Sequence, residues 1–205
     1  MSTTIEGPDG LMRCRWSATT PEFLPYHDTE WGFPLDDDRR LFEMMCLESF
    51  QSGLSWRTIL AKRENFRAAF RNFDFDQIAR FAPRDVERLL KNAGIVRHRG
   101  KIESVINNAR RARELIKREG SFAAFVWRYE DPKRSAQRPA AALGAESLAL
   151  SKELRRLGWA FVGPTTVHAF RQATGLINDH VEGCVIRAQA QRARRAFRPP
   201  AGVVS

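Results

Sequence analysis

Disulfides, membrane spans and export signals find no support in this 205-residue sequence. Cysteine occurs only at Cys14, Cys46 and Cys184, and an odd, widely spaced set does not make a disulfide framework. No apolar run approaches the roughly 18 residues that span a bilayer, and the first ten residues lack a charged-then-apolar signal pattern. We therefore expect a soluble cytoplasmic protein that does not bind membranes.

Acidic charge is in the minority. Lysine and arginine number 34 against 24 aspartates and glutamates, which gives a formal charge of +10. This balance favours a polyanionic partner. Nucleic acid ranks first and an anionic membrane surface second, so we expect nucleic acid as the partner and no membrane. At 43% hydrophobic residues the chain can bury a sizeable core. We expect a flexible lead over residues 1–10, one globular helical domain over 11–186, possible as two closely packed lobes, and a flexible basic tail over 187–205.

Strand patterns are lacking too, so the predicted fold class is all-α. Apolar residues at helical spacing predict helices with short joints between them. The expected ranges are 38–52, 56–71, 75–81, 84–93, 101–118, 121–129, 147–157 and 164–174. Residues 131–145 contain two prolines and few large apolar groups, which predicts a surface connection.

Residues 14–34 are broken by prolines and glycine and predict an irregular segment. They nevertheless contain Trp16, Phe23, Tyr26 and Trp31. So many aromatic side chains must pack on something, either as a flap over the helical core or as a loop that lines a ligand.

Glu48 is the unusual residue of the predicted helix over 38–52. It lies in an apolar stretch, where a carboxylate is costly unless something pairs with it. Helical spacing alone favours a position on the wet face of the helix. The other interpretation is that Glu48, beside methionine, phenylalanine and tryptophan, recognises a flat ligand that is cationic or donates hydrogen bonds.

A second candidate site is the joint AGIVRHRGK between two predicted helices. Gly94 and Gly100 bracket the joint, and Arg97, Arg99 and Lys101 supply cations. Such a joint at a helix N-terminus can present backbone N–H groups and charge to phosphate, although an ordinary turn with solvated arginines has the same pattern. With the overall charge, we favour DNA-backbone binding, which resembles the helix-hairpin-helix superfamily.

A third candidate is a metal site. His180 and Cys184 are four residues apart, so on a helical turn both point the same way. Cys14 and His27 could complete a tetrahedral Cys2His2 set for zinc, whose four protein ligands argue for a structural role. A buried free cysteine beside a core histidine is the alternative.

Several strings together identify a family. The sequence resembles the 3-methyladenine DNA glycosylase I family of bacteria from about Arg13 to Cys184. The strings that carry the resemblance are RCRW, YHDTEWGFP, LFEMMCLESFQSGLSW, KRENFRAAF, AGIVRHRGKI, FVGP and GLINDHVEGC.

The resemblance implies roles for individual residues. The structural zinc falls on the four ligands named above, and the helix-hairpin-helix element falls on residues 94–100. Gln51 and Leu54 occupy the loop that approaches the gap left by the extruded nucleotide. The base pocket falls on Glu48, with Tyr26, Trp56, Trp16 and Trp31 around it.

The implied enzyme is a monomeric DNA repair glycosylase that flips 3-methyladenine out of double-stranded DNA and hydrolyses its N-glycosidic bond. No aspartate occurs between Asp85 and Asp131, so the long helix after the hairpin supplies none to support the sugar. No pocket lysine suggests a Schiff base, so we expect a monofunctional enzyme that leaves an abasic site.

Three residues depart from the usual family pattern. Phe23 stands where tyrosine is frequent, Ser49 where glycine is common and His168 where tyrosine is frequent. Ser49 could shrink or tilt the pocket. For His168 we favour a buried, hydrogen-bonded histidine over a titrating group near DNA.

Two other functions fit parts of the pattern. One is a non-catalytic, zinc-clipped helix-hairpin-helix module that binds damaged DNA and does not need Glu48. The other is a metal-dependent hydrolase with an open zinc, which requires one of the four ligands to be absent from the site.

Overall fold

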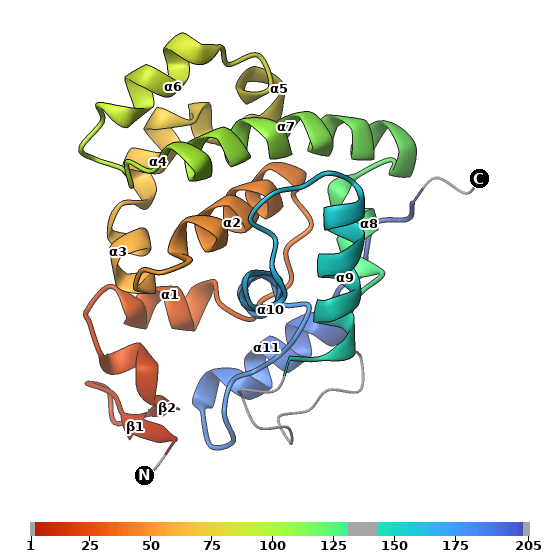
Figure 1. Cartoon of the computed structure of the whole chain (residues 1–205). Helices are drawn as coiled ribbons and strands as arrows, with labels where there is room; N and C mark the ends of the chain where they lie inside the picture. Colours follow the sequence, from red (N-terminus) through yellow and green to blue (C-terminus); the bar gives the residue numbers. More distant parts are fainter. Residues whose placement is uncertain (1–2, 131–142, 203–205) are drawn as a thin grey trace.

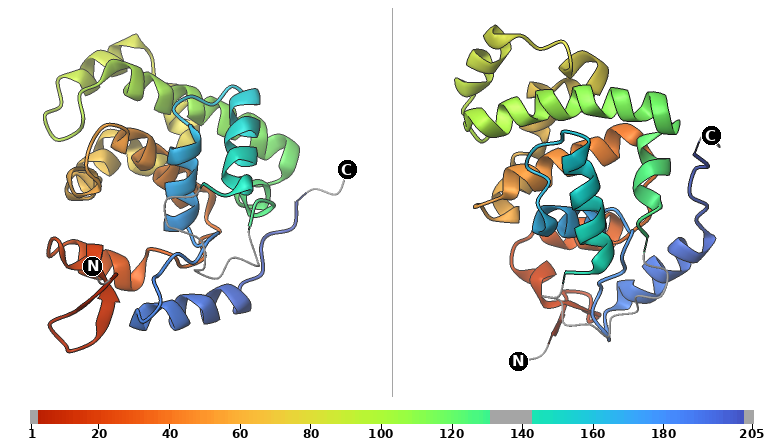
Figure 2. Two further views of the ribbon diagram at one scale, coloured as in Figure 1. Left: turned by 60° about the horizontal axis from the view of Figure 1, so that its bottom comes forward. Right: turned by 45° about the vertical axis from the view of Figure 1, so that its right-hand side comes forward.

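The computed structural model describes residues 3–130 and 143–202, and the chain is mostly helical within them (Figures 1 and 2). Two short strands, β1 and β2, and two 3-10 helices, η1 and η2, accompany the α-helices. The strands and 3-10 helices are β1 Thr4–Glu6, β2 Met12–Cys14, η1 Arg15–Ala18 and η2 Arg71–Phe73. The α-helices are α1 Phe23–Thr29, α2 Asp38–Gln51, α3 Trp56–Ala61, α4 Arg63–Ala69, α5 Phe75–Ile78, α6 Pro83–Leu90, α7 Arg99–Glu119, α8 Phe122–Trp127, α9 Ala145–Arg156, α10 Pro164–Ala173 and α11 Val185–Ala196.

Helix α2 lies at the centre of the molecule, and the helix predicted over 38–52 is confirmed (Figure 1). It begins where the side chain of Asp37 accepts a hydrogen bond from the backbone N–H of Arg40. Every residue from 41 to 50 is buried, and α2 contacts α3, α7, α8 and α10. A helix enclosed on all sides can hold a polar side chain away from water.

Helix α7 is the longest, with 21 residues, and it packs on α2, α5, α6 and α8. It lies between the small helices α4–α6 and the remaining helices (Figure 1). One buried apolar cluster extends through the chain from Tyr26 to Leu176, and a smaller one holds Cys14, Cys184 and Ile186. No helix in the described ranges is long and apolar enough to cross a membrane.

The prediction that the chain has no sheet is wrong for its first residues. Strands β1 and β2 pair antiparallel, with Thr4 opposite Cys14. Arg13, on β2, forms ion pairs with Asp9 in the turn and with Asp28 on α1. Strands of three residues are too short for alternation to show in sequence.

The aromatic segment is less irregular than predicted, because residues 23–29 form α1. Pro25 lies in the first turn, where the missing N–H has no intrahelical partner to lose. The single helix predicted over 56–71 is two helices, α3 and α4, separated at Lys62.

The basic tail also differs from its prediction, because α11 covers residues 185–196. Ile186, Ala190 and Arg194 are spaced four apart and are all buried, so the arginine run conceals an amphipathic helix. Arg194 donates a hydrogen bond to Glu130 at 2.8 Å. Of the predicted connection 131–145, residues 131–142 lie outside the described residues, and α9 begins at Ala145.

Candidate functional site

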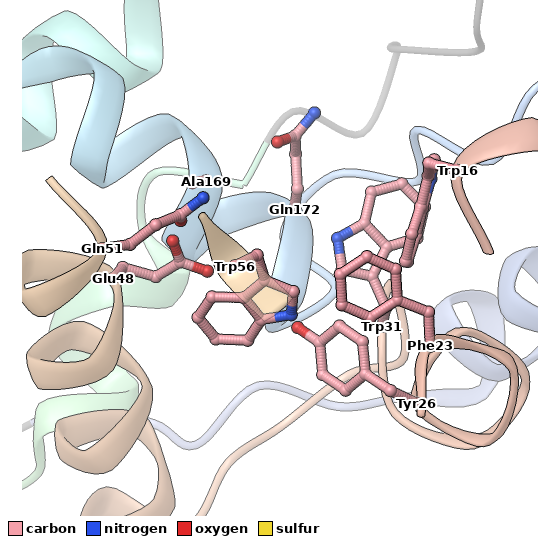
Figure 3. A pocket seen from close by; sticks show the side chains of 9 residues that line it. All are labelled: Trp16, Phe23, Tyr26, Trp31, Glu48, Gln51, Trp56, Ala169 and Gln172. Atoms are coloured by element: carbon pink, nitrogen blue, oxygen red, sulfur yellow. The ribbon is translucent and has the colours of Figure 1, made fainter. Parts of the chain in front are cut away.

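A cavity of about 270 Å³ lies between the N-terminal segment, the end of α2, the start of α3 and α10 (Figure 3). Five residues predicted for the base pocket, and Gln51 with them, line this one cavity. The lining residues are Trp16, Phe23, Tyr26, Trp31, Glu48, Gln51, Trp56, Ala169 and Gln172. The aromatic segment therefore lines a cavity as well as covering core.

Glu48 is the only carboxylate among the described residues that line the cavity. Its side chain points toward Trp56 (Figure 3), and only 5% of the residue is exposed, so its predicted place on a wet helix face is wrong. Burial raises the pKa of Glu48 to about 8. Its buried Oε2 has no hydrogen-bond partner among the described residues, which leaves it available to a ligand.

Aromatic rings form the walls of the cavity. The centroids of Tyr26 and Trp56 are 5.5 Å apart, and those of Trp16 and Trp31 are 5.1 Å apart. Trp56 also has a buried Nε1–H without a partner among the described residues. The cavity thus offers a flat ligand aromatic faces, N–H donors and one carboxyl group.

The sequence analysis missed Gln172 and Ala169, which α10 contributes to the cavity. The Nε2 of Gln172 donates to Asp179 Oδ2 at 2.8 Å, which fixes the amide. No sequence signal points to Gln172, because other polar residues, such as His168 and Arg171, occur along the same helix.

A groove adjoins the cavity and shares Glu48, Gln51 and Ala169 with it. The loop between α2 and α3 forms one side, where Leu54 is 42% exposed. Thr165 and Thr166, at the N-terminus of α10, form the other side. The first N–H groups of a helix have no intrahelical partner, so this side favours anions.

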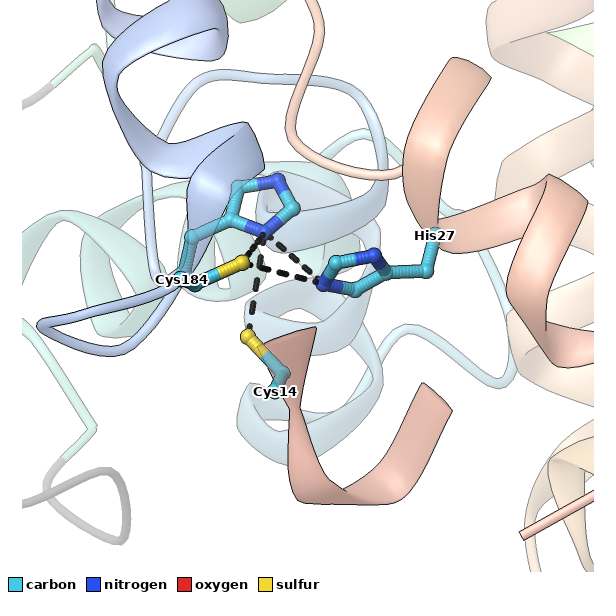
Figure 4. Close-up of side chains that lie close together, drawn as sticks. Cys14, His27 and Cys184 are labelled. Carbon is cyan, nitrogen blue, oxygen red and sulfur yellow. Dashed lines mark hydrogen bonds between the residues drawn. The ribbon is translucent and has the colours of Figure 1, made fainter. Parts of the chain in front are cut away.

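The four predicted metal ligands come together in one buried cluster, and Figure 4 labels Cys14, His27 and Cys184 of it. Cys14, His27, His180 and Cys184 are all buried, and their donor atoms lie within 4.8 Å of one another. His180 Nδ1 is 3.1 Å from His27 Nε2 and 3.8 Å from Cys14 Sγ, and Cys184 Sγ is 3.6 Å from His27 Nε2. A tetrahedral zinc ion with bonds of about 2.0–2.3 Å holds its donor atoms about 3.3–3.8 Å apart, so the set fits a metal ion.

The groups around the cluster orient its ligands. His27 Nδ1 is 2.7 Å from a carboxylate oxygen of Asp28, and His180 Nε2 donates to the carbonyl of Trp31 at 3.0 Å. Each imidazole therefore turns its other nitrogen toward the cluster, as metal-binding histidines do. The contact between the two thiols lowers the pKa of Cys184 and raises that of Cys14, so one thiolate of the pair is favoured.

The predicted hairpin joins α6 to α7 through residues 91–98. Gly94 lies in the turn, whereas Gly100 lies in the first turn of α7, which starts at Arg99 rather than near 101. Arg97 is exposed, and Arg99 is exposed but paired with Glu87 at 2.6 Å. Arg97 and Arg99 therefore lie in or beside the first turn of α7, next to the hairpin turn.

Lys101 does not join the other hairpin cations. It is only 6% exposed, and its Nζ donates to the carbonyls of Phe50 and Ser52 at the end of α2. Its predicted role at phosphate is wrong, because the first turn of α7 packs against α2 and directs this side chain inward. Lys62, which the sequence analysis did not place, donates to the carbonyls of Ala93 and Gly94 and holds the hairpin turn.

Comparison with known proteins bears on these sites. The family model of methyladenine glycosylase matches residues 16–188. The chain belongs to the methyladenine glycosylase family. It is 46% identical over 180 residues to DNA-3-methyladenine glycosylase 1 of Escherichia coli (strain K12), which covers 85% of this chain and 96% of the relative. It is 39% identical over 177 residues to DNA-3-methyladenine glycosylase of Haemophilus influenzae (strain ATCC 51907 / DSM 11121 / KW20 / Rd), with 84% and 96% covered.

Solved structures of the family share the fold. A crystal structure of 3-methyladenine DNA glycosylase I matches with a TM-score of 0.79 at 47% identity, covering 84% of this chain and 98% of that one. A variant of 3-methyladenine DNA glycosylase I in complex with 3-methyladenine matches with a TM-score of 0.78 at 35% identity, covering 85% and 97%.

The three departures from the methyladenine glycosylase pattern have different consequences. Phe23 lines the cavity without a hydroxyl group. Ser49 does not line it, because its Oγ lies 2.7 Å from the carbonyl of Met45 and 3.0 Å from that of Phe161. His168 is buried with Nδ1 3.1 Å from Ser147 Oγ, in agreement with a hydrogen-bonded core histidine.

Proposed function

We propose that the chain is a DNA repair glycosylase that extrudes 3-methyladenine from alkylated double-stranded DNA and hydrolyses its N-glycosidic bond. The observation that carries the proposal is the buried carboxyl group of Glu48, whose unpartnered oxygen faces an aromatic cavity. The relatives named DNA-3-methyladenine glycosylase support the choice of base.

The lining of the cavity suits an alkylated adenine. A base inside a duplex is stacked and out of reach, so such enzymes extrude it and hold it between aromatic side chains. Methylation at N3 makes the adenine in DNA cationic, so Trp56 and Tyr26 add a cation–π attraction. Glu48 Oε2 accepts a hydrogen bond from an amino group or protonated ring nitrogen of the base, which disfavours bases with a carbonyl there.

The reaction needs little help at the sugar, because a cationic base leaves as a neutral molecule. No aspartate lies on α7 to support an electron-poor sugar. Binding and orientation therefore supply most of the rate enhancement. No lysine lines the cavity among the described residues, so water attacks the sugar and the enzyme is monofunctional.

The surface around the cavity grips DNA. The α6–α7 hairpin binds backbone phosphate through the N-terminal N–H groups of α7 and through Arg97 and Arg99 as sequence-independent contacts. Leu54, exposed at the loop tip, fills the gap left by the extruded nucleotide beside Gln51. The groove toward Thr165 receives the displaced sugar-phosphate.

The Cys14, His27, His180 and Cys184 cluster holds a structural zinc ion. Two thiols and two imidazoles are a preferred donor set for zinc, and four protein ligands complete its tetrahedral shell. The ion joins the two ends of the chain and supplies no open position for chemistry. A zinc-dependent hydrolase is disfavoured for that reason.

The reaction products test this proposal. The protein is incubated with methylated duplex DNA, the released bases are separated by chromatography, and the DNA strand is examined before and after alkali. We expect free 3-methyladenine and a strand that breaks only after alkali treatment. DNA binding without any released base would instead identify a non-catalytic DNA-binding module.

A further inference from the structure

The loop between α9 and α10, residues 157–163, exposes an aromatic ring that the cavity does not use. Phe161 is 40% exposed and is the one aromatic residue among the exposed large apolar side chains of the described chain. Its φ is +56°, a left-handed backbone conformation that a bulky side chain adopts only at a cost. Neither the exposed ring nor the left-handed backbone stabilises the free protein, so both point to a ligand that the ring contacts.

The surrounding elements hold this loop in place. Asn108 of α7 both donates to the carbonyl of Ala160 at 2.9 Å and accepts from its N–H at 2.8 Å. Ser151 of α9 donates to the carbonyl of Val162 at 2.7 Å. These anchors come from two helices and flank Phe161 on both sides, so its backbone is held in place.

The ring stands beside the hairpin. Its centroid is 6.3 Å from that of His98, which caps the N-terminus of α7. Its Cζ lies 3.8 Å from the point where a Cβ on Gly100 would be. On the other side, the Phe161 carbonyl lies 3.0 Å from Ser49 Oγ, next to Glu48 on α2. Phe161 therefore lies between the proposed phosphate contact and the helix that carries the pocket carboxylate.

We propose that the Phe161 ring is a DNA-contacting residue that packs against the base stack next to the extruded nucleotide. This inference rests on the proposed function for the identity of the partner. Duplex DNA held by the hairpin must pass the ring to bring a nucleotide to the cavity, and an exposed aromatic edge then meets the bases. Phenylalanine wedges are a common way to stabilise unstacked steps. Leu54 would fill the gap itself, and Phe161 would support the neighbouring base pair.

Phe161→Gly separates this role from a structural one. Glycine adopts the left-handed backbone freely, so we expect the melting temperature of the variant to be kept. Binding is measured by fluorescence anisotropy with duplex DNA that carries a stable abasic-site analogue. We expect Kd to rise about 10-fold, as loss of one aromatic–base contact does elsewhere. Phe161→Tyr keeps the ring and should bind DNA as the wild type does.

Two controls keep the result interpretable. Leu148→Gly removes another exposed apolar side chain, on α9, and should leave DNA affinity unchanged. Affinity for free 3-methyladenine, followed by tryptophan fluorescence, should be the same in wild type and Phe161→Gly, because Phe161 does not line the cavity.

Wild-type DNA affinity in Phe161→Gly would overturn the inference, and so would a loss that Phe161→Tyr shares. The assay does not depend on turnover. A wild-type protein that releases no base would defeat the proposed function, while weaker DNA binding by Phe161→Gly would still support the contact.

Discussion

Glu48 lowers the stability of the free protein. Its carboxyl group is buried, its pKa is raised to about 8, and Oε2 lacks a hydrogen bond among the described residues. Perturbed pKa values gather at functional sites, so a buried acid without a hydrogen-bond partner points to a ligand. In the proposed reaction, the ligand beside Glu48 is the cationic methylated base.

The pH dependence of stability follows from this pKa. Between its ordinary value of 4.5 and about 8, the folded protein binds more protons at Glu48 than the unfolded chain does. The free energy of unfolding therefore falls as pH rises through this window, by at most about 1.4 kcal/mol per pH unit. Glu48→Gln should remove this fall, so its stability relative to wild type should increase with pH.

Denaturant unfolding of both proteins at several pH values measures the difference. Glu64→Gln, which removes an exposed carboxylate, is the control for net charge. A wild-type and a Glu48→Gln curve that run parallel from pH 4.5 to 8 would contradict the raised pKa.

Single residues also show which parts of the candidate site could be predicted from the sequence. Glu48 and the four cluster residues stand out in the sequence as candidates, but spacing alone favours a wet helix face for Glu48 and leaves a buried free cysteine open for the cluster. The resemblance to a family supplies their predicted roles. The contacts of Lys101 were not predictable, because a lysine beside two arginines has the same pattern whether it faces solvent or caps a neighbouring helix. Phe161 and Gln172 gave no signal, since their surroundings come from distant segments.

At the scale of elements, the contact of α7 with the end of α2 links the proposed DNA grip to the proposed pocket. Lys101 on α7 donates to two carbonyls of the segment between Glu48 and Trp56, where helix carbonyls lack intrahelical partners. The loop that carries Leu54 is thereby fixed relative to the hairpin.

Lys101→Met tests this link, because methionine keeps the apolar stem and removes both hydrogen bonds. We expect the free energy of unfolding to drop by about 1–3 kcal/mol, since buried carbonyls lose a charged donor. Arg97→Met should instead preserve stability, weaken DNA binding and reduce its salt dependence by about one phosphate contact. Thermal melts measure the stability of the two variants, and salt titrations measure how their DNA binding depends on salt. If Lys101→Met kept its stability and its DNA binding became less dependent on salt, Lys101 would instead contact a DNA phosphate.

The long helices were predictable from apolar spacing, as α2 and α10 show. The N-terminal sheet, α1 and α11 were not. Three-residue strands carry no periodicity, prolines concealed α1, and a run of arginines concealed α11, whose buried face includes Arg194. These elements depend on contacts with distant parts of the chain, which a local sequence pattern does not show.

At the scale of the whole molecule, the metal cluster and the cavity share a wall. The ring centroids of Trp31 and His180 are 4.7 Å apart, and those of Trp16 and His27 are 5.2 Å apart. Both tryptophans also line the cavity. A metal ion held by the two imidazoles would therefore also fix two walls of the pocket, besides joining segments near the two ends of the chain.

Loss of a cluster ligand should therefore affect stability and pocket together. We expect Cys184→Ala to lower the bound zinc per chain, the melting temperature and the affinity for free 3-methyladenine. Cys46→Ala is the matched control, since Cys46 is buried outside the cluster, and it should keep zinc and affinity. Metal analysis, thermal melts and tryptophan fluorescence provide the readouts. Full zinc content in Cys184→Ala would contradict the ligand assignment.

The central claim is that the buried carboxyl group of Glu48 reads the alkylated base during excision. Single-turnover release of 3-methyladenine from methylated duplex DNA, with wild type and Glu48→Gln at concentrations that saturate DNA, tests it most directly. We predict a release rate at least about 100-fold slower for Glu48→Gln with DNA affinity unchanged, because a glutamine cannot ionise beside the cationic base as the Glu48 carboxyl group can. Equal release rates for the two proteins would contradict the account.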